Sequence, residues 1–413
     1  MPIFDQGYQH WRGPLSGHGR RWLTIMLQGV RVQLTRIWLR RMLYLSLIPA
    51  LVFIGFMSVW GLVEQRSEGA LALIRNFLPS SLLMDPRAQR AMIWTIAFSY
   101  FFKIQMYFIM ILVAVAGPGL ISSDLRFNAL PLYFSRPLNR VDYFVGKLGV
   151  IGALVGAVAV VPALLAYVLG LAFSLDFGVV KDTWQILLGS IGYGLLITIS
   201  AGALMLAMSS LSRRSLYVGV SWAGLWIITG WVGTVLEITF REGLTHNIYH
   251  AEMSRWLAAN PAPVGVQAPS PYERPSRRRL NFARVGPMRP NEEGTKWLEN
   301  WLKAAKEADI KAREKESEAL QSDWRPLFSY VSNLERISDS LLNTDAAWEK
   351  IGKAFAVAQG KTDDGDEPTD GRRFAEMMVP QYPWQWSGGV LGGLLGLSIC
   401  ILTLRVKSLD RLK

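Results

Sequence analysis

The sequence predicts an all-α integral membrane protein with six transmembrane helices, an N-terminal interfacial helix and a helical extracytoplasmic insert between spans five and six. Hydrophobic residues make up 51% of the 413 positions. Several windows exceed the roughly 18 apolar residues that indicate a membrane span. Lys and Arg gather beside these windows, whereas the stretch between the last two windows is long and charged. Because a backbone in lipid needs internal hydrogen-bond partners, each span must be helical.

Residues 1–42 form the predicted N-terminal cytoplasmic segment. Within residues 20–41, apolar side chains recur at helical spacing, with polar side chains on another face. The apolar positions are Leu23, Leu27, Val30, Leu34, Ile37 and Trp38. This pattern predicts an amphipathic helix lying along the membrane interface. A simple extension of the first span into the cytoplasm is the alternative.

Residues 43–237 contain five predicted spans, and residues 386–413 contain the sixth span and a cytoplasmic tail. The predicted spans are 43–63, 94–121, 145–174, 184–210, 216–237 and 386–404. With the N-terminus inside, the cytoplasmic segments carry 17 Lys and Arg, and the short outer segments carry five. Since basic residues favour the cytoplasmic side, we expect both termini in the cytoplasm and the protein in the bacterial cytoplasmic (inner) membrane, in contact with its lipids.

Three features inside the spans suggest particular roles. Apart from Lys147 at the start of the third span, Lys103 is the only Lys or Arg within a predicted span, so it is either functional or snorkels to the outer surface. Pro118 is expected to bend or end the second span. The sixth span carries a small-residue pattern that favours close helix contact, with this chain or with a second copy. Its glycines are Gly388, Gly389, Gly392, Gly393 and Gly396.

Residues 238–385 form the predicted extracytoplasmic insert. Proline is frequent in 261–290, which indicates an irregular segment, and residues 291–322 and about 326–357 are expected to be helical. Glu242, His246 and His250 follow one another at four-residue spacing, so they share a helix face and are a weak candidate metal site. A solvated helix start explains these three residues equally well. The zinc-protease pattern is absent.

The segment 122–147, between the second and third spans, is long, basic and aromatic for a simple turn. Leu130, Tyr133 and Phe134 lie close in sequence to Arg126 and Arg136. Aromatic and Arg side chains are enriched at protein contacts. The segment therefore indicates a docking loop, and a loop that binds lipid headgroups is the alternative.

Residues 119–147 resemble the corresponding segment of ABC transporter permeases of the type-2 exporter class. The first matching string is Ile121, Asp124, Leu125 and Arg126; the second is Ser135, Arg136 and Pro137; the third is Arg140, Tyr143, Gly146 and Lys147. The interfacial helix and the six-span plan match as well, but the insert is longer than the family's usual outer loop. The resemblance implies a coupling loop that docks on a separate ATPase subunit. The implied docking residues are Asp124, Arg126, Leu130, Tyr133, Phe134, Ser135, Arg136, Pro137, Arg140, Tyr143 and Lys147.

The resemblance also implies a transport component rather than an enzyme, with no catalytic residues and no cofactor on this chain. The chain has no phosphate-binding loop, because Gly146 and Lys147 are followed by Leu148. ATP and Mg²⁺ are therefore expected on the ATPase subunit, and a complete exporter needs a second permease half. A nucleic-acid partner is not expected, because the basic excess lies beside the spans.

Two other functions are compatible with the sequence. The spans could anchor the insert and display it to a partner on the outer face. Less favoured is a metal-dependent membrane enzyme at Glu242, His246 and His250.

Overall fold

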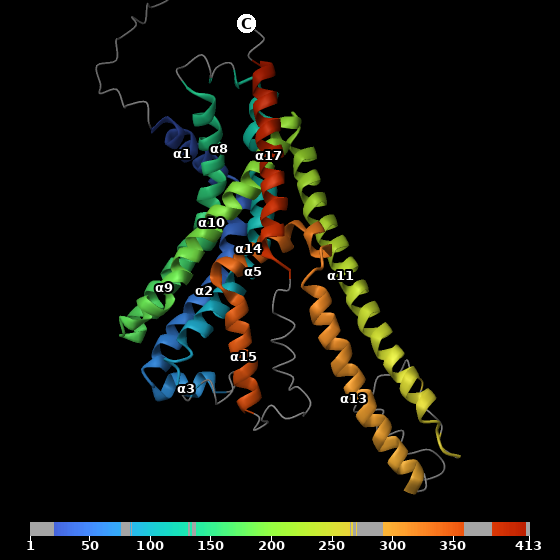
Figure 1. Cartoon of the computed structure of the whole chain (residues 1–413). Helices are drawn as coiled ribbons and strands as arrows, with labels where there is room; N and C mark the ends of the chain where they lie inside the picture. Colours follow the sequence, from blue (N-terminus) through green and yellow to red (C-terminus); the bar gives the residue numbers. More distant parts are fainter. Residues whose placement is uncertain are drawn as a thin grey trace, which may run out of the picture.

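The computed structural model describes residues 20–75, 83, 85–130, 133, 138–264, 266, 270, 292–358 and 382–409. Over these ranges the regular secondary structure is all helical, as predicted (Figure 1). Six helices are long and apolar enough to cross a membrane, which confirms the six-span prediction. They are Ile37–Glu64, Arg90–Arg126, Arg140–Ser174, Gly178–Leu211, Ser215–Ala259 and Trp384–Arg405. Each is longer than the sequence predicted.

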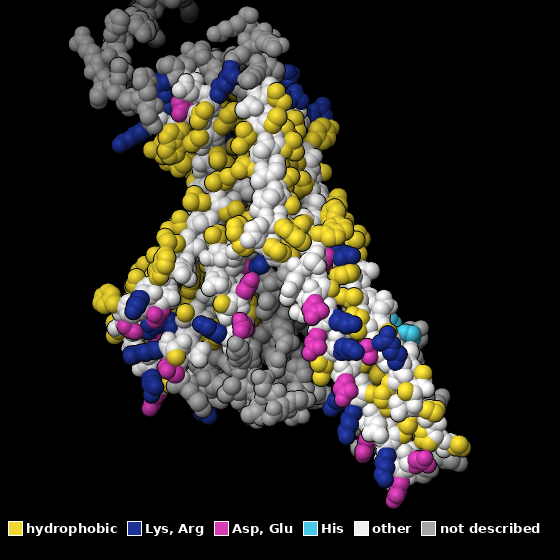
Figure 2. Space-filling view, viewed as in Figure 1, with side chains coloured by type: hydrophobic (Ala, Val, Ile, Leu, Met, Phe, Trp, Pro, Cys, Tyr) yellow, Lys and Arg dark blue, Asp and Glu magenta, His cyan; other side chains and the backbone are white. Residues whose placement is uncertain are grey.

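The two ends of the bundle differ. We call the end that carries the N-terminal helix and the last residues of the sixth span the terminal end. The opposite end, from which the insert leaves, is the insert end. Figure 2 shows hydrophobic side chains over the bundle between these ends, with acidic and basic side chains toward the insert end and beyond it and further Lys and Arg side chains at the terminal end. This distribution is typical of a multi-pass membrane protein.

The N-terminal helix α1 (Arg21–Leu34) is separate from the first span, α2 (Ile37–Glu64). The backbone becomes extended at Arg36, with ψ of 121°, so the uninterrupted extension considered above does not occur. One face of α1 packs on α8 (Arg140–Val155), where Gly146 leaves space for Ile25. Apolar residues on other faces of α1, including Leu27 and Leu34, are exposed. The location of α1 at a membrane surface stays a prediction.

Proline interrupts two of the spans. Helix α5 (Arg90–Ala116) ends just before Pro118, and the short α6 (Gly119–Arg126) continues the chain, as the sequence predicted. The third span consists of α8, a five-residue π segment (Gly156–Val160) and α9 (Val161–Ser174). Pro162 lies in the first turn of α9 and has no N–H to donate, so the regular bonding pattern shifts there. The fourth span, α10 (Gly178–Leu211), is uninterrupted.

Helix α11 (Ser215–Ala259) continues well past the predicted fifth span, for 45 residues in all. Its distal part pairs with α13 (Glu292–Leu320) to form a two-helix stalk that extends away from the bundle (Figure 1). Tyr249 and Met253 of α11 pack against Trp301 and the small residues of α13. Ion pairs add to this contact, with Arg241 Nε 3.0 Å from a Glu316 oxygen.

The other described helices of the insert pack into the bundle instead. The 3-10 turn Arg325–Phe328 leads into α14 (Tyr330–Leu342), whose first turn is capped by the Ser329 hydroxyl. Leu334 and Leu342 of α14 belong to the same buried core as the spans, and α15 (Thr344–Ala358) packs along α5. Helix α14 thus lies among α5, α10, α11 and α17 (Trp384–Leu409).

The glycine pattern of α17 has no partner helix among the described residues. A Cβ placed on Gly389, Gly392, Gly393 or Gly396 would meet nothing within 4 Å. Most of the fifth span is also unburied. These two spans therefore expose surfaces to lipid or to another chain.

Candidate functional site

The segment 122–147 begins at the bend between α5 and α6, where a serine of α10 stabilises the backbone. The Ser209 hydroxyl donates a hydrogen bond of 2.6 Å to the Pro118 carbonyl. It also accepts the backbone N–H groups of Ile121 and Ser122, at 3.1 and 3.0 Å. Because α6 starts at Gly119, these donors belong to its unsatisfied first turn. The bend is therefore a defined structure attached to α10.

Three of the predicted docking residues bind one another. The Tyr143 hydroxyl donates to Asp124 Oδ2 at 2.7 Å, and Lys147 Nζ lies 2.7 Å from the same oxygen. The Lys147 ammonium also lies over the Tyr143 ring, 5.4 Å from its centroid. The Asp124 and Lys147 side chains are only 15% and 12% exposed. This cluster fastens α6 to α8 and is internal scaffolding of the loop.

Leu130 and Tyr133 continue this scaffold. Leu130 is buried, and the Tyr133 ring packs 5.6 Å from that of Tyr143. Burial raises the pKa of Tyr133, and the negative charge of Asp124 adds to the rise, so the phenol stays protonated at neutral pH. These contacts place both residues against the bundle.

The turn after α6, by contrast, is exposed on the surface. Asn128 adopts a left-handed conformation, with φ of 53°, which ends the helix and directs the chain back toward the bundle. Arg126 is exposed, and its guanidinium lies 5.5 Å from the ring centroid of Phe127, which is 74% exposed. An Arg and an aromatic ring are thus presented together at the terminal end. Arg140 is partly buried at the start of α8, and Phe134, Ser135, Arg136 and Pro137 lie outside the described residues.

The N-terminal helix holds the same bend from the other side. Gln33, which is buried, donates a 3.1 Å hydrogen bond to the Ala116 carbonyl at the end of α5. Arg36 donates to the neighbouring Val115 carbonyl at 3.4 Å. Since α1 also packs on α8, a displacement of α1 would act on both helices that flank the loop.

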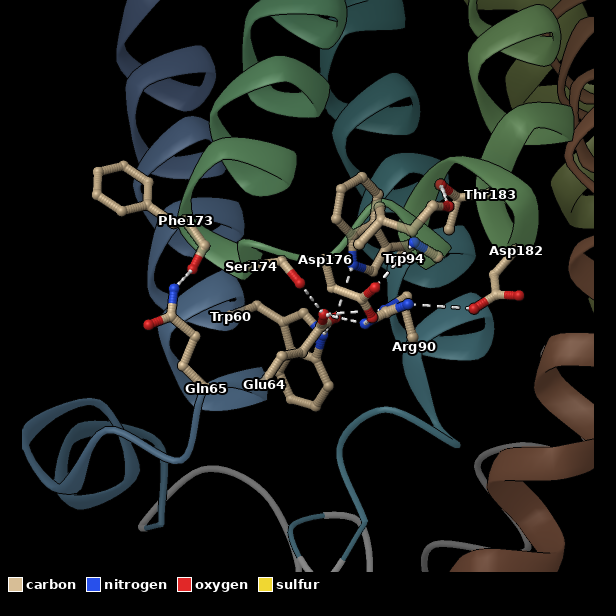
Figure 3. Close-up of polar contacts among 12 residues, drawn as sticks. Trp60, Glu64, Gln65, Arg90, Trp94, Phe173, Ser174, Asp176, Asp182 and Thr183 are labelled. Atoms are coloured by element: carbon tan, nitrogen blue, oxygen red, sulfur yellow. Dashed lines mark hydrogen bonds and ion pairs between the residues drawn. The ribbon is translucent and has the colours of Figure 1, made fainter.

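A second polar cluster, at the insert end, is centred on Arg90 (Figure 3). The Arg90 side chain is 3% exposed and that of Glu64 is fully buried. Arg90 Nε donates to Glu64 at 2.9 Å, and its terminal nitrogens lie 2.8 Å from Asp176 and 3.1 Å from Asp182. One guanidinium therefore joins the ends of α2 and α5 to the turn between α9 and α10.

The carboxylate of Glu64 is saturated with donors. Besides Arg90, it accepts from Trp60 Nε1 at 2.9 Å, Trp94 Nε1 at 3.4 Å and Ser174 Oγ at 2.6 Å (Figure 3). Asp176 also accepts the Gly178 N–H. The hydrogen bond from Arg90, with this backbone bond, lowers the pKa of Asp176. We interpret the Arg90 cluster as a rigid fastening of the spans.

A third cluster joins the insert to the spans through Lys103. Its Nζ lies 3.5 Å from Asp339 Oδ2 on α14, and the Ser99 hydroxyl donates to Asp339 Oδ1 at 3.2 Å. Near the start of α14, the hydroxyls of Tyr330 and Ser200 lie 2.9 Å apart. Lys103 therefore pairs with the insert, a partner that neither interpretation of the sequence had included.

The weak metal candidate is not supported by the geometry. Glu242, His246 and His250 follow one another along the stalk part of α11, and His250 Nε2 lies 3.4 Å from Ser254 Oγ. In the described ranges no group of three His, Cys, Asp or Glu side chains is placed to hold a metal ion.

Comparisons of this chain with protein-family models, with curated proteins and with solved structures found no match. The resemblance of residues 119–147 to type-2 exporter permeases therefore stays a prediction. The functional argument below depends on that sequence pattern and on the geometry of the three clusters.

The sequence analysis missed the Arg90 cluster and the acidic residues of α14. Glu64 and Arg90 have opposite charges at the facing ends of the first two spans, which could have indicated a pair. Glu335 and Asp339 are four residues apart in an amphipathic helix pattern, which places both on one face. Their link to Lys103 had no signal in the sequence.

Proposed function

We propose that this chain is the membrane-spanning permease subunit of an ATP-driven ABC exporter. In this proposal the segment 122–147 docks on a separate ATPase subunit, which binds ATP and Mg²⁺, and its movement switches the bundle between two packings. A second permease half, identical or related, completes the transporter. The chain itself is not a catalyst.

The observation that carries the proposal is the division of the motif residues into two sets. Asp124, Tyr143 and Lys147 bind one another and hold the loop against α8, whereas Arg126 and Phe127 are exposed beside them. The end of α6, with an exposed Arg and an aromatic ring beside it, is suited to transmit force from a docked protein, because Asp124 ties α6 to α8.

The bonds around Pro118 support the same function. Force on α6 would reach α10 through Ser209 and α1 through the carbonyls at the end of α5. The unpartnered surfaces of α17 and of the fifth span support the second permease half.

The test is a pull-down of the tagged full-length chain from its native membrane in a mild detergent, with identification of co-purifying proteins. The test variant is Arg126→Glu combined with Phe127→Ala. The matched control is Arg66→Glu, which changes an exposed Arg at the insert end. We expect an ATPase with a phosphate-binding loop to co-purify with the parent chain and the control, and to be lost with the test variant.

Two results would refute the proposal. One is recovery of the parent chain without any such ATPase. The other is an ATPase that binds the Arg126→Glu, Phe127→Ala variant as well as it binds the parent, because the exposed tip would then not be the docking surface.

The stalk favours a second candidate, an anchor that displays a binding surface. Among the described helices of the insert, α13 stands clear of the bundle together with the distal part of α11, whereas α14 and α15 pack into it. If display is the function, a chain that lacks residues 242–320 should insert normally and lose a partner bound at the insert end. This test does not depend on whether the chain binds an ATPase.

A further inference from the structure

Helix α14 brings several charged groups into the bundle, and not every carboxylate among them is paired with a cation. Arg336 donates to the Tyr382 carbonyl at 2.6 Å and lies 3.3 Å from Asp345. Lys103 is paired with Asp339. Each of these two cations therefore has its own carboxylate partner, one on α15 and one on α14.

Glu335 is the acidic group that remains. It is partly buried on α14, and its carboxylate makes no hydrogen bond or ion pair with another described residue. A carboxylate in this position is disfavoured in its charged form unless a cation or a proton neutralises it. The geometry thus leaves a single uncompensated acid on the helix that joins the insert to the spans.

The titratable groups around Glu335 come from every neighbouring element. Helix α5 contributes Lys103 and Tyr107, α10 contributes Tyr193, and the chain before α17 contributes Tyr382. Asp339 and Arg336 lie on α14 itself, Asp345 on α15, and Glu237 of α11 lies near Tyr382. Lys103 favours the ionised form of Glu335, while Asp339 and burial oppose it, and burial is the largest effect.

We propose that Glu335 is a proton-binding site that controls the docking of α14, with the protonated form holding the helix in the bundle and the ionised form loosening it. The inference does not require an ATPase or a transport function. It concerns the contact between the insert and the spans, and it is testable on the isolated chain.

The direction of the pH effect follows from the pKa of Glu335. Burial raises this pKa from 4.5 to about 7 in the docked state. Undocked, the side chain returns to water and to its ordinary pKa, so the docked state binds the proton more tightly. Docking is therefore strongest at acidic pH, weakens as the pH rises from 4.5 to about 7, and is weakest above that.

The experiment measures how accessible α14 is at different pH values. Cys400 is the only cysteine, so a Cys400→Ser chain provides a background for one introduced thiol. Ser338→Cys is nearly isosteric and places the thiol at a buried position of α14. The chain is reconstituted in nanodiscs, and the rate of labelling by a membrane-impermeant maleimide is measured at pH 5.5 and pH 8. Arg255→Cys, exposed on the stalk, gives the reference rate that corrects for thiol ionisation.

We expect the corrected labelling rate at position 338 to be at least tenfold higher at pH 8 than at pH 5.5, because the pKa of Glu335 differs by more than one unit between the docked and the undocked state and each unit corresponds to a factor of ten. Adding Glu335→Gln should keep the rate low at both pH values, because the amide is always neutral. The matched control Glu307→Gln, at an exposed site on the stalk, should leave the tenfold rise unchanged.

Either of two results would overturn the inference. A corrected rate that is the same at both pH values in the parent would show that protonation does not govern docking. A rise that persists in the Glu335→Gln chain would assign the pH dependence to a different group. A lost ATPase interaction would leave this result unaffected, so the two proposals fail independently.

Discussion

The Arg90 cluster at the insert end and the Lys103 cluster within the bundle both join separate elements, but only the first is electrostatically complete. Glu64 receives four donors, and Arg90 contacts three carboxylates. In the second cluster Lys103 pairs with Asp339, and Glu335 has no partner among the described residues. A saturated network has one favoured arrangement, whereas an unsaturated one changes energy when a proton binds. The comparison distinguishes the Arg90 cluster, which joins the spans permanently, from the contact between α14 and the spans, which is able to open.

The largest effect should come from Arg90→Met. Removing the guanidinium leaves the buried Glu64 carboxylate without its cation, and breaking a buried pair in this way costs about 3–5 kcal/mol. Thermal unfolding of the purified chain in detergent measures the loss. The double variant Arg90→Met, Glu64→Gln should recover a large part of it. A loss below about 1 kcal/mol would mean that this cluster is no more essential than an exposed pair.

A smaller effect is expected from Lys103→Met. The Lys103 side chain is 32% exposed, so the ion pair with Asp339 is partly screened, and we expect a loss of about 1–2 kcal/mol. The loss should appear as faster proteolysis within the insert, while unfolding of the spans changes little. Combining Lys103→Met with Asp339→Asn should restore most of the resistance. If the spans unfold as readily as in Arg90→Met, the two clusters do not differ as proposed.

The smallest effect is on the pH dependence of stability, which should have opposite signs in the two clusters. Because Arg90 lowers the pKa of Asp176, the stabilisation from this carboxylate is present above its ordinary pKa of 3.8 and is lost as the pH falls below it. The stability difference between the parent and Asp176→Asn should therefore be constant at neutral pH and shrink only in strong acid. Docking of α14 should instead weaken as the pH rises toward neutral. A parallel pH response of the two clusters would contradict the distinction.

The loop 122–147 shows how much of a candidate site the sequence predicts. The motif predicted Asp124, Tyr143 and Lys147 as docking residues, and in the structure these three contact one another. It did not indicate that these three face inward while Arg126 faces outward. That division depends on the left-handed turn at Asn128, a residue type that tolerates this conformation, and on the packing of α8, which the motif does not specify.

The sequence by itself determined the helices and the spans. A bilayer requires each backbone group to bond within its own segment, so uninterrupted apolar length is sufficient to predict a spanning helix. Pro118 similarly determines a local break, because the missing N–H acts within one turn. These are short-range effects, and a single sequence contains all the information they need.

Only the tertiary structure decided which charged and polar residues contact one another. Arg90 and Asp182 are 92 residues apart in the chain, and Ser99 and Asp339 are 240 apart. Helical periodicity places a residue on a face of its own helix but does not select the helix that will cover that face. The amphipathic pattern of α14 suited a surface cap as well as a buried element. Its docking among α5, α10 and α17, with Asp339 on Lys103 and Glu335 unpaired, is a result of packing between distant segments.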